Sequence, residues 1–483
     1  MEKNKTMSFY IQIGAAVLTM IVVGMLPPIG QITPYGMKVL GIFLGCIIGW
    51  GFGHQIVISI FALILLSLSG GGSLGAIFSA AYGNQSLLMV VFGLIFCFGM
   101  EQTGIMQWVA NFVLSRKFAT KGPWFISLAF WLSCCLCSAV ITNCLPVIIL
   151  MWSMFYNIVE KVQVPRSSKW VQITMIMMCV VGYTGSVIMP YAAWNLLCYS
   201  MAMSVVPGLQ VNLFAHCTLV LVCNVFIITL IFVVSKFVLG KDVNFNVSTD
   251  VIDVEATKMD KRSKWGLFYL AVLAIAMFLP NVLDATVPGI SILKTLTTAG
   301  IFAVGSLLLC ITYVDGKPLM EPLQAVKSLP WPLYYLLGTA LYLASLLTAQ
   351  DVGISATLMV ALKSMLGNMG TVTVIMLFVV FGCVVTNAVN NVVCVNIFIP
   401  IGATLLMTLG GGTVAVSILT SLLAVVLYLG LMVPSGSVVG ALMHGNSEWL
   451  QAKNIYLYAG IGCIIVTIVC FVVGIPLGMV LFN

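Results

Sequence analysis

Hydroxyl and amide side chains occur at two places within long apolar stretches of this sequence. Residues 386–391 read Thr-Asn-Ala-Val-Asn-Asn inside the apolar segment 371–400, and residues 138–143 read Ser-Ala-Val-Ile-Thr-Asn inside a similar segment. Such groups are unfavourable in hydrocarbon unless they contact protein, water or a ligand. Two similar groups in distant parts of the chain therefore predict one site that is built from two copies.

The spacing within each group indicates what the site could bind. Ser138 and Thr142 are four residues apart, as are Thr386 and Asn390, and an asparagine follows each pair. Side chains four apart share one face of a helix. Their oxygens, with the free carbonyls of an unwound turn, suit a small hard cation such as Na⁺, whereas free N–H groups at helix N-termini suit an anion. The alternative is that these residues only bond neighbouring helices.

The composition determines the class of protein. Of the 483 residues, 61% are hydrophobic and 7% are charged, whereas soluble domains have about 25% charged residues. Apolar runs long enough to span a bilayer recur from residue 10 to the end of the chain. The sequence therefore predicts a polytopic membrane protein without a large soluble domain, in the plasma membrane and in contact with its lipid.

The net charge of +7 is explained by orientation, and we expect no nucleic-acid partner. If the N-terminus is cytoplasmic and the spans alternate, all but three of the twenty Lys and Arg residues lie in the cytoplasm. The three that fall outside are Lys38, Lys294 and Lys363. This arrangement predicts an extracellular C-terminus.

The first half of the chain, 1–235, is predicted to form one structural repeat. Spans are expected near residues 10–26, 35–50, 56–68 and 86–113. The apolar segment 123–159 has basic residues on both flanks, which predicts a re-entrant hairpin, or a pair of spans, with both ends cytoplasmic. A broken helix is expected over 171–206, interrupted at 182–186 by glycines and hydroxyls with Pro190 just beyond. A span over 211–234 follows.

The second half, 265–483, repeats this order after a charged cytoplasmic linker at 236–264. Spans near 265–279, 292–313 and 331–347 precede a second hairpin over 371–409, whose flanks carry so little charge that its ends are expected outside. A second broken helix over 413–446 is interrupted at 434–437, and a last span ends near residue 482. We therefore predict an all-α fold of inverted-topology repeats with about 11 transmembrane helices, two re-entrant hairpins and two broken helices.

This plan resembles the divalent anion/sodium symporter family of the ion transporter superfamily, which includes citrate, dicarboxylate and sulfate permeases. That family has a Ser-Asn-Thr motif at each hairpin tip and, in the second copy, a proline nine residues after the asparagine; Asn391 and Pro400 have this spacing. The resemblance implies a homodimer with an elevator movement and one Na⁺ in each repeat. It implies that the first ion is held by Ser138, Thr142, Asn143 and Gly185, and the second by Thr386, Val389, Asn390, Asn391 and Gly436.

The substrate site departs from the family pattern. The family threonines that contact a substrate carboxylate correspond to Cys144 and Val392, and the Thr-Pro-Pro after each broken helix is missing. The residues that the resemblance assigns to substrate are Asn143, Cys144, Ser186, Asn391, Val392 and Ser437. Because neither hairpin contains Lys or Arg, an anion would depend on helix N-termini, amides and the neighbouring cation.

A few other ionisable residues lie in or near the apolar segments. Intramembrane carboxylates are candidates for function, but Glu101 and Asp351 both come late in their spans before a glycine, which favours helix ends at the membrane interface. The three histidines of the chain, His54, His216 and His444, lie near predicted span ends. The alternative to an interfacial position without function is proton coupling through one of them.

The sequence therefore predicts a secondary active transporter, coupled to Na⁺, for a small di- or tricarboxylate or sulfate-like anion. The alternatives are a Na⁺-independent anion exchanger, an anion channel and a membrane-embedded enzyme. No nucleophile with its base and no carboxylate pair is recognisable in the sequence, so we expect no enzyme. In the transporter, the hairpins and broken helices would move as one unit against a scaffold of the first spans of each half.

Overall fold

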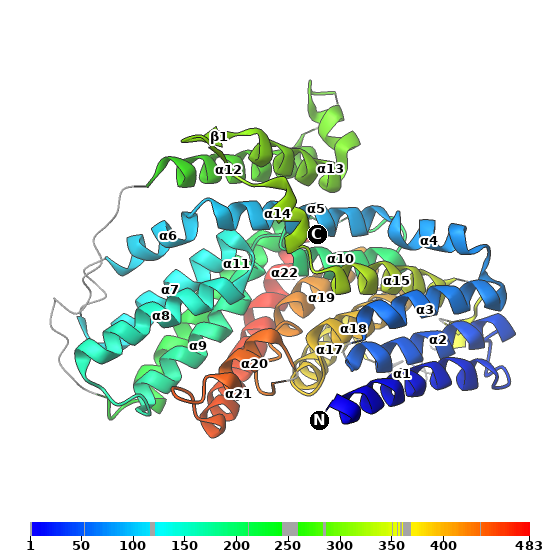
Figure 1. The fold of residues 1–483 in the computed structure, drawn as a ribbon, viewed down its shortest axis with the longest axis horizontal. Helices are drawn as coiled ribbons and strands as arrows, with labels where there is room; N and C mark the ends of the chain where they lie inside the picture. Colours follow the sequence, from blue (N-terminus) through cyan, green and yellow to red (C-terminus); the bar gives the residue numbers. More distant parts are fainter. Residues whose placement is uncertain are drawn as a thin grey trace.

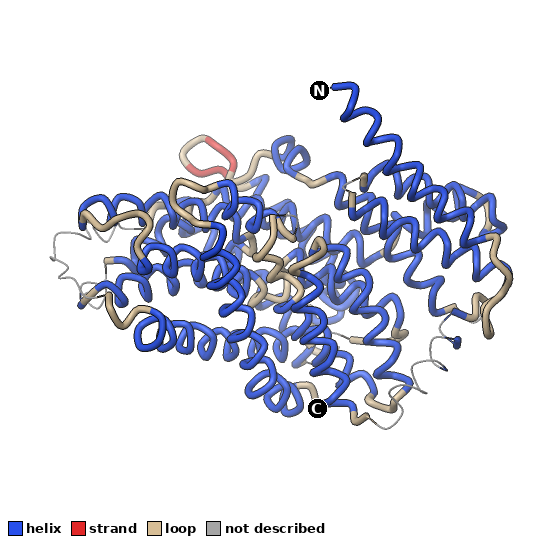
Figure 2. Tube along the Cα trace, turned by 90° about the horizontal axis from the view of Figure 1, so that it is seen from below, coloured by secondary structure: helices blue, strands red, loops and turns tan. Residues whose placement is uncertain are grey.

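The structure is a computed structural model that describes residues 2–483 except 53, 116–120, 211, 244–258, 284–285, 350, 355, 358–359, 361–368 and 435. Most of the traced chain is helical, with loops between the helices, as Figure 2 shows. The strands of the described part are the two-residue β1 (Tyr313–Val314) and β2 (Lys317–Pro318), which pair antiparallel. The predicted all-α class is confirmed.

The first six helices do not follow the predicted spans in every case. They are α1 (Glu2–Gly24), α2 (Pro34–Gly51), α3 (Gln55–Leu66), α4 (Leu74–Tyr82), α5 (Gln85–Gln102) and α6 (Ile105–Leu114). The single span predicted over 86–113 is two helices, because Gly104 takes a positive φ of 75° between α5 and α6. Helix α4 was not predicted.

The first hairpin and broken helix follow. Their helices are α7 (Pro123–Ile141), α8 (Cys144–Val162), α9 (Lys169–Ser186) and α10 (Ala193–Val205), and α11 (Leu213–Val234) comes next. The helices α7 and α8 meet at Thr142 and Asn143, at the predicted polar group.

The interruption predicted at residues 182–186 is in the wrong place. Helix α9 continues to Ser186, and the break covers residues 187–192, around Pro190, which has no N–H to continue a helix. The glycines serve close packing instead. A Cβ on Gly185 would lie 2.8 Å from the Cα of Cys135 in α7, so only glycine allows the two helices to approach this closely.

The second half contains the corresponding elements. They are α12 (Lys261–Val282), α13 (Ile290–Ile311), α14 (Pro322–Ser328), α15 (Trp331–Thr348), α17 (Thr371–Thr386), α18 (Asn391–Thr408), α19 (Gly412–Val426), α20 (Val438–Gly445), α21 (Ala452–Val469) and α22 (Ile475–Leu481). The pair α17 and α18 meets at residues 387–390, and the chain between α19 and α20 is not helical. Arg116, Lys117, Lys363, Ser435 and most of the predicted linker lie outside the described residues.

Eight helices of the described chain are long and apolar enough to cross a membrane, or up to nine if one bent pair counts as a span. Four shorter apolar helices accompany them, among them α15, α17 and α19. The protein is therefore a multi-pass membrane protein. The predicted total of about 11 spans stays a prediction.

The packing brings the two halves together in the middle of the molecule. Helices α1, α2 and α3 pack in order at one end, α7, α8 and α9 lie at the other, and α13 packs across α5 (Figure 1). Between them, α10 of the first broken helix contacts α18 and α19 of the second half, and also α5 and α15. The two breaks and the two hairpin tips therefore approach one another near the centre.

Candidate ion and substrate site between the hairpins

The tip of the first hairpin is a tight turn closed by a left-handed residue. Thr142 has a φ of 59°, and its N–H donates to the carbonyl of Ser138 at 2.7 Å. Asn143 then caps α8, since its Oδ1 accepts from the N–H of Leu145 at 3.3 Å. Helix α7 thus ends at Ile141, before Thr142.

Side chains of this tip reach across to α5. The Thr142 hydroxyl is hydrogen-bonded to the Cys97 thiol, and Nδ2 of Asn143 donates to Oε1 of Glu101 at 2.9 Å. Ser138, by contrast, is buried inside the helical part of α7. The prediction that Ser138 and Thr142 share one helix face is wrong, because the left-handed turn rotates Thr142 toward α5.

Ser138 has a feature that fits a cation ligand. Its Oγ is fully buried and has no hydrogen-bond partner within the described part of the chain. Buried hydroxyls are nearly always paired, so an orphaned one calls for an explanation such as an ion. Gly185 lies against Cys135, one turn before Ser138 on α7. The carbonyl of Gly185 accepts from the N–H of Ile188 at 3.1 Å.

The second tip is organised differently. Thr386 is the last residue of α17 and Asn390 is the N-cap of α18, where its Oδ1 accepts from the N–H of Val392 at 3.0 Å. These two residues therefore lie on different helices, and the shared face predicted for them is also wrong. The Thr386 hydroxyl donates to the carbonyl of Leu427 at 2.6 Å, and the Asn391 N–H donates to that of Gly436 at 3.0 Å. The second tip thus binds the second break.

Backbone oxygens gather where the second tip meets this break. A Cβ on Gly430 would lie 2.8 Å from the oxygen of Gly436 and 2.9 Å from that of Thr386. A Cβ on Gly436 would lie 2.8 Å from the oxygen of Gly430 and 3.2 Å from that of Thr386. The carbonyl oxygens of Thr386, Gly430 and Gly436 thus lie close to the two glycines, and those of Gly430 and Gly436 also accept hydrogen bonds from Ser437 and Asn391. Backbone oxygens of an unwound segment are the kind of donor that suits Na⁺ at a broken helix.

Asn387, which the sequence did not assign to the site, holds the break in position. Its Oδ1 accepts from the N–H groups of Leu431 and Met432, both at 3.0 Å, and its Nδ2 donates to the carbonyl of Cys383 at 2.8 Å. One amide thereby satisfies two backbone donors of the unwound segment. The sequence did contain a signal for this role, since Asn387 belongs to the polar group at residues 386–391.

Four of the other assigned residues take positions away from the open part of the site. Ser437 caps α20 and donates to the carbonyl of Gly430 at 2.6 Å, while Ser186 donates to the carbonyl of Tyr183 at 2.8 Å. Cys144 is buried at the start of α8. The Val389 side chain is exposed on the turn.

A cavity of about 470 Å³ opens between these elements. The first tip contributes Thr142 and Asn143, the second contributes Val392, and Glu101 lies in the wall with other residues of α5. Further lining comes from the start of α10, the second break, α14 and α15. Among the described residues that line the cavity there is no Lys or Arg. Three helices, α8, α10 and α18, begin at its wall, so their N-terminal dipoles face it.

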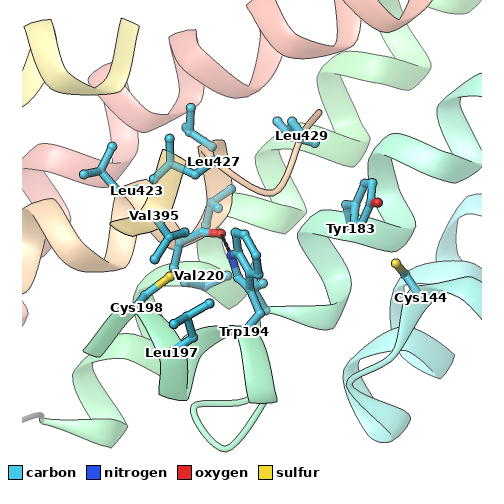
Figure 3. Packing of buried hydrophobic residues seen from close by; sticks show 14 of the residues in the cluster. Cys144, Tyr183, Trp194, Leu197, Cys198, Val220, Val395, Leu423, Leu427 and Leu429 are labelled. Carbon is cyan, nitrogen blue, oxygen red and sulfur yellow. Dashed lines mark hydrogen bonds between the residues drawn. The ribbon is translucent and has the colours of Figure 1, made fainter. Parts of the chain in front are cut away.

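Aromatic rings join the two breaks beside the cavity. Trp194 of α10 stacks on Tyr428 of the second break with centroids 4.3 Å apart, and Tyr183 lies 4.2 Å from Tyr428. The Trp194 indole donates to the carbonyl of Ala424 at 2.7 Å. Figure 3 shows this bond among the buried side chains that surround Trp194. These contacts connect the two breaks through one packed aromatic cluster.

Glu101 is the main residue whose position the sequence reasoning missed. It is the next-to-last residue of α5, as expected for a helix end, but its carboxylate lines the cavity and accepts from Asn143. The signal that could have identified it was its type, because a carboxylate in an apolar segment is a functional candidate by default. Its partner lies 42 residues away in sequence, which local spacing does not reveal.

Comparison with known proteins supports the architecture. The crystal structure of the YdaH transporter of Alcanivorax borkumensis, described as revealing an unusual topology, matches 86% of this chain and 88% of its own, with a TM-score of 0.53 and 15% identity. At that identity the likeness concerns the fold alone. No match was found among curated protein sequences.

The family assignment comes from the sequence profile of the citrate transporter family, which matches residues 5–430. This match covers most of the chain, including both hairpin tips, and it ends just after the start of the second break. The predicted resemblance to transporters of the citrate, dicarboxylate and sulfate permease kind is thereby confirmed, and the protein is a transporter rather than an enzyme. The chain belongs to the citrate transporter family.

Proposed function

We propose that this protein is a secondary active transporter that couples the movement of a di- or tricarboxylate to Na⁺. The observation that carries the proposal is the cavity on which both hairpin tips, α10 and the second break converge. It lies beside the two sets of oxygen atoms that suit a cation. A transporter of this kind needs both elements within reach of one another.

The anion would be held by groups that carry no formal positive charge. The Asn143 amide and the Thr142 hydroxyl line the cavity, and the N-termini of α8, α10 and α18 face it. Helix N-termini attract carboxylates through their free N–H groups and dipoles. Glu101 has the opposite effect, because a carboxylate in the wall repels an anion. A cation that accompanies the anion would offset this repulsion.

Na⁺ is the cation that we assign to this role. At the second tip, the carbonyl oxygens of Thr386, Gly430 and Gly436 would hold it. At the first tip, the unpaired Ser138 hydroxyl would contribute, together with Thr142 and Asn143 of the turn and Gly185 near the end of α9. Each ion would place positive charge next to a helix N-terminus, which favours the anion further. Proton coupling through His216 is not needed for this scheme.

Transport would proceed by an elevator movement in a homodimer. The cavity is lined by residues of α5, α14 and α15 and by residues of the two tips and α10. We assign the first group to the scaffold and the hairpins with the broken helices to the moving unit. The proposed orientation in the plasma membrane, with a cytoplasmic N-terminus, an extracellular C-terminus and oppositely oriented repeats, follows from the charge pattern.

Uptake by proteoliposomes tests the proposal. Purified protein would be supplied with labelled citrate, succinate, malate or sulfate in gradients of Na⁺, of K⁺ and of Mg²⁺. We expect saturable uptake of a carboxylate that requires Na⁺. Uptake that depends on internal substrate but not on Na⁺ would instead establish an exchanger. A current that does not saturate and needs no gradient of a second solute would establish a channel.

A further inference from the structure

A second cavity, of about 700 Å³, lies at the opposite ends of α5 and α10 from the first. It is formed where α5, α11 and α13 begin and where α10 and α12 end. Its polar lining residues are Gln85, Tyr199, Gln210, Lys294, Thr297 and Thr298. Because the cytoplasmic linker is predicted to lie before α12, the far end of α12 and hence this cavity face the outside.

The charge of this cavity is opposite to that of the first. Lys294 lines it, and no acidic side chain does among the described residues. None of the ion pairs formed within the described chain involves Lys294. Lys294 is exposed, and an ammonium group that has no counter-ion among the described residues produces a positive potential that concentrates small anions.

The backbone of α13 is strained at the same place. Thr297 has φ 55° and ψ 177° inside the helix, three residues after Lys294. A positive φ is an outlier for a β-branched residue, and such strain is found preferentially at functional sites. The kink lies in the cavity wall, where the hydroxyls of Thr297 and Thr298 accompany the charge of Lys294.

An apolar contact separates the two cavities. A Cβ on Gly93 of α5 would lie 2.8 Å from Cδ1 of Leu196 in α10, so the helices touch there. The buried rings of Phe96, Tyr191 and Phe302 surround this contact, with centroids 6.0 to 6.5 Å apart. In this conformation, an anion that followed α5 and α10 from the second cavity to the first would have to pass this apolar contact.

We propose that the second cavity is an access site, which binds the transported anion on the outside before the apolar contact opens. The inference rests on the proposed function. The Lys294 ammonium would pair with one carboxylate of a di- or tricarboxylate, while the amides of Gln85 and Gln210 and the threonine hydroxyls donate to the remaining oxygens. The first cavity, which carries Glu101, then receives the anion together with Na⁺.

The Lys294→Gln variant tests the access site. In uptake of labelled citrate by intact cells at low ionic strength, we expect KM to rise about fivefold with an unchanged kcat. The difference should disappear when an inert salt is raised at fixed Na⁺, and Lys294→Arg should restore KM. Lys38→Gln is the matched control, because Lys38 is also predicted outside and lines neither cavity.

An unchanged KM in Lys294→Gln, or an equal rise in Lys38→Gln, would overturn the access site. If Lys294→Gln does not reach the membrane, Gln210→Glu serves as a second variant, because it adds a negative charge to the same cavity and should also raise KM. A KM for Gln210→Glu equal to that of the unaltered protein would then overturn the inference. If citrate is not taken up, the same comparison is made with succinate or malate; absence of uptake of all three by the unaltered protein contradicts the proposed function instead, so the two failures are distinguishable.

Discussion

The first hairpin tip bonds Glu101 on α5 through Asn143, in the wall of the cavity, whereas the second bonds the unwound chain between α19 and α20 through Thr386 and Asn391. Both tips have hydroxyls and asparagines at equivalent places in their sequences. The second tip contributes only Val392 to the cavity, while the first contributes Thr142 and Asn143. The comparison teaches that two similar motifs can divide one task. In the proposed mechanism the first tip would provide polar contacts to the substrate, and the second would mainly provide a cation cradle, which consists of the carbonyl oxygens of Thr386, Gly430 and Gly436.

Gly436→Ala tests the cradle at the second tip and should have the largest effect. The added Cβ would lie 2.8 Å from the Gly430 oxygen, so backbone ligands must shift. We expect Na⁺-dependent uptake to fall about 100-fold or more, as misplaced groups in a preorganised site cause losses of this size. Uptake is measured in proteoliposomes over a series of Na⁺ concentrations.

Gly445→Ala serves as the control for this substitution. It lies at the end of α20, where an added Cβ would meet no atom within 4 Å, and its uptake should equal that of the unaltered protein. Normal Na⁺ dependence in Gly436→Ala would show that the carbonyl oxygens at the second tip do not form a cation site.

Asn143→Ala tests the first tip and should have the next largest effect. It removes the amide that bonds Glu101 and the cap of α8. A hydrogen bond from the Asn143 amide to a substrate carboxylate would contribute about 1.5–3 kcal/mol, so kcat/KM should fall about 10- to 150-fold. In a background that already carries Glu101→Ala, the same substitution should cause a smaller further loss, because the contact between the two residues is already gone. Fully additive losses would show that Asn143 acts independently of Glu101.

Ser138→Ala separates an ion ligand from a structural hydroxyl. Because Oγ of Ser138 has no protein partner in the described chain, its removal should not lower the thermal stability. Loss of one ligand should raise the Na⁺ concentration for half-maximal uptake about tenfold, which corresponds to about 1.4 kcal/mol.

Ser133→Ala is the matched control for Ser138→Ala. Its hydroxyl is also buried and unpaired on α7, and we expect its Na⁺ dependence to be unaltered. A similar shift in both variants would assign the effect to the packing of α7 instead of to an ion.

The parts of this arrangement that the sequence predicted depend on local signals. Polar groups within apolar runs located both tips, and Pro190 with its neighbouring glycines located the first break to within a few residues. The second break was placed at 434–437, and it extends from the end of α19 at Val426 to Ser437. A helix end is determined mainly by residues close to it in the chain, so one sequence suffices to find it.

The parts that the sequence did not predict depend on tertiary contacts. The pairing of Glu101 with Asn143 brings together α5 and the first tip, and no periodicity in either segment predicts it. Gly185 looked like a helix breaker, but it packs against Cys135 of α7. Gly430 joins the cradle only because the second break folds back onto Thr386. In each case the partner, and not the residue type, determines the role.

Val392→Thr is the substitution with the smallest expected effect, and it tests whether the second tip can be made to resemble the first. Val392 lines the cavity at the position where the resembling family has a threonine that contacts a carboxylate. A hydroxyl of nearly the same size adds one donor, whose net contribution is about 0.5–1.5 kcal/mol, so KM for succinate should fall about two- to tenfold. Val389→Thr places the same group on the exposed side of the turn, away from the cavity, and should leave KM unchanged. If Val392→Thr also leaves KM unchanged for every carboxylate, then the second tip contributes no contact to the substrate, and its role is restricted to the cation.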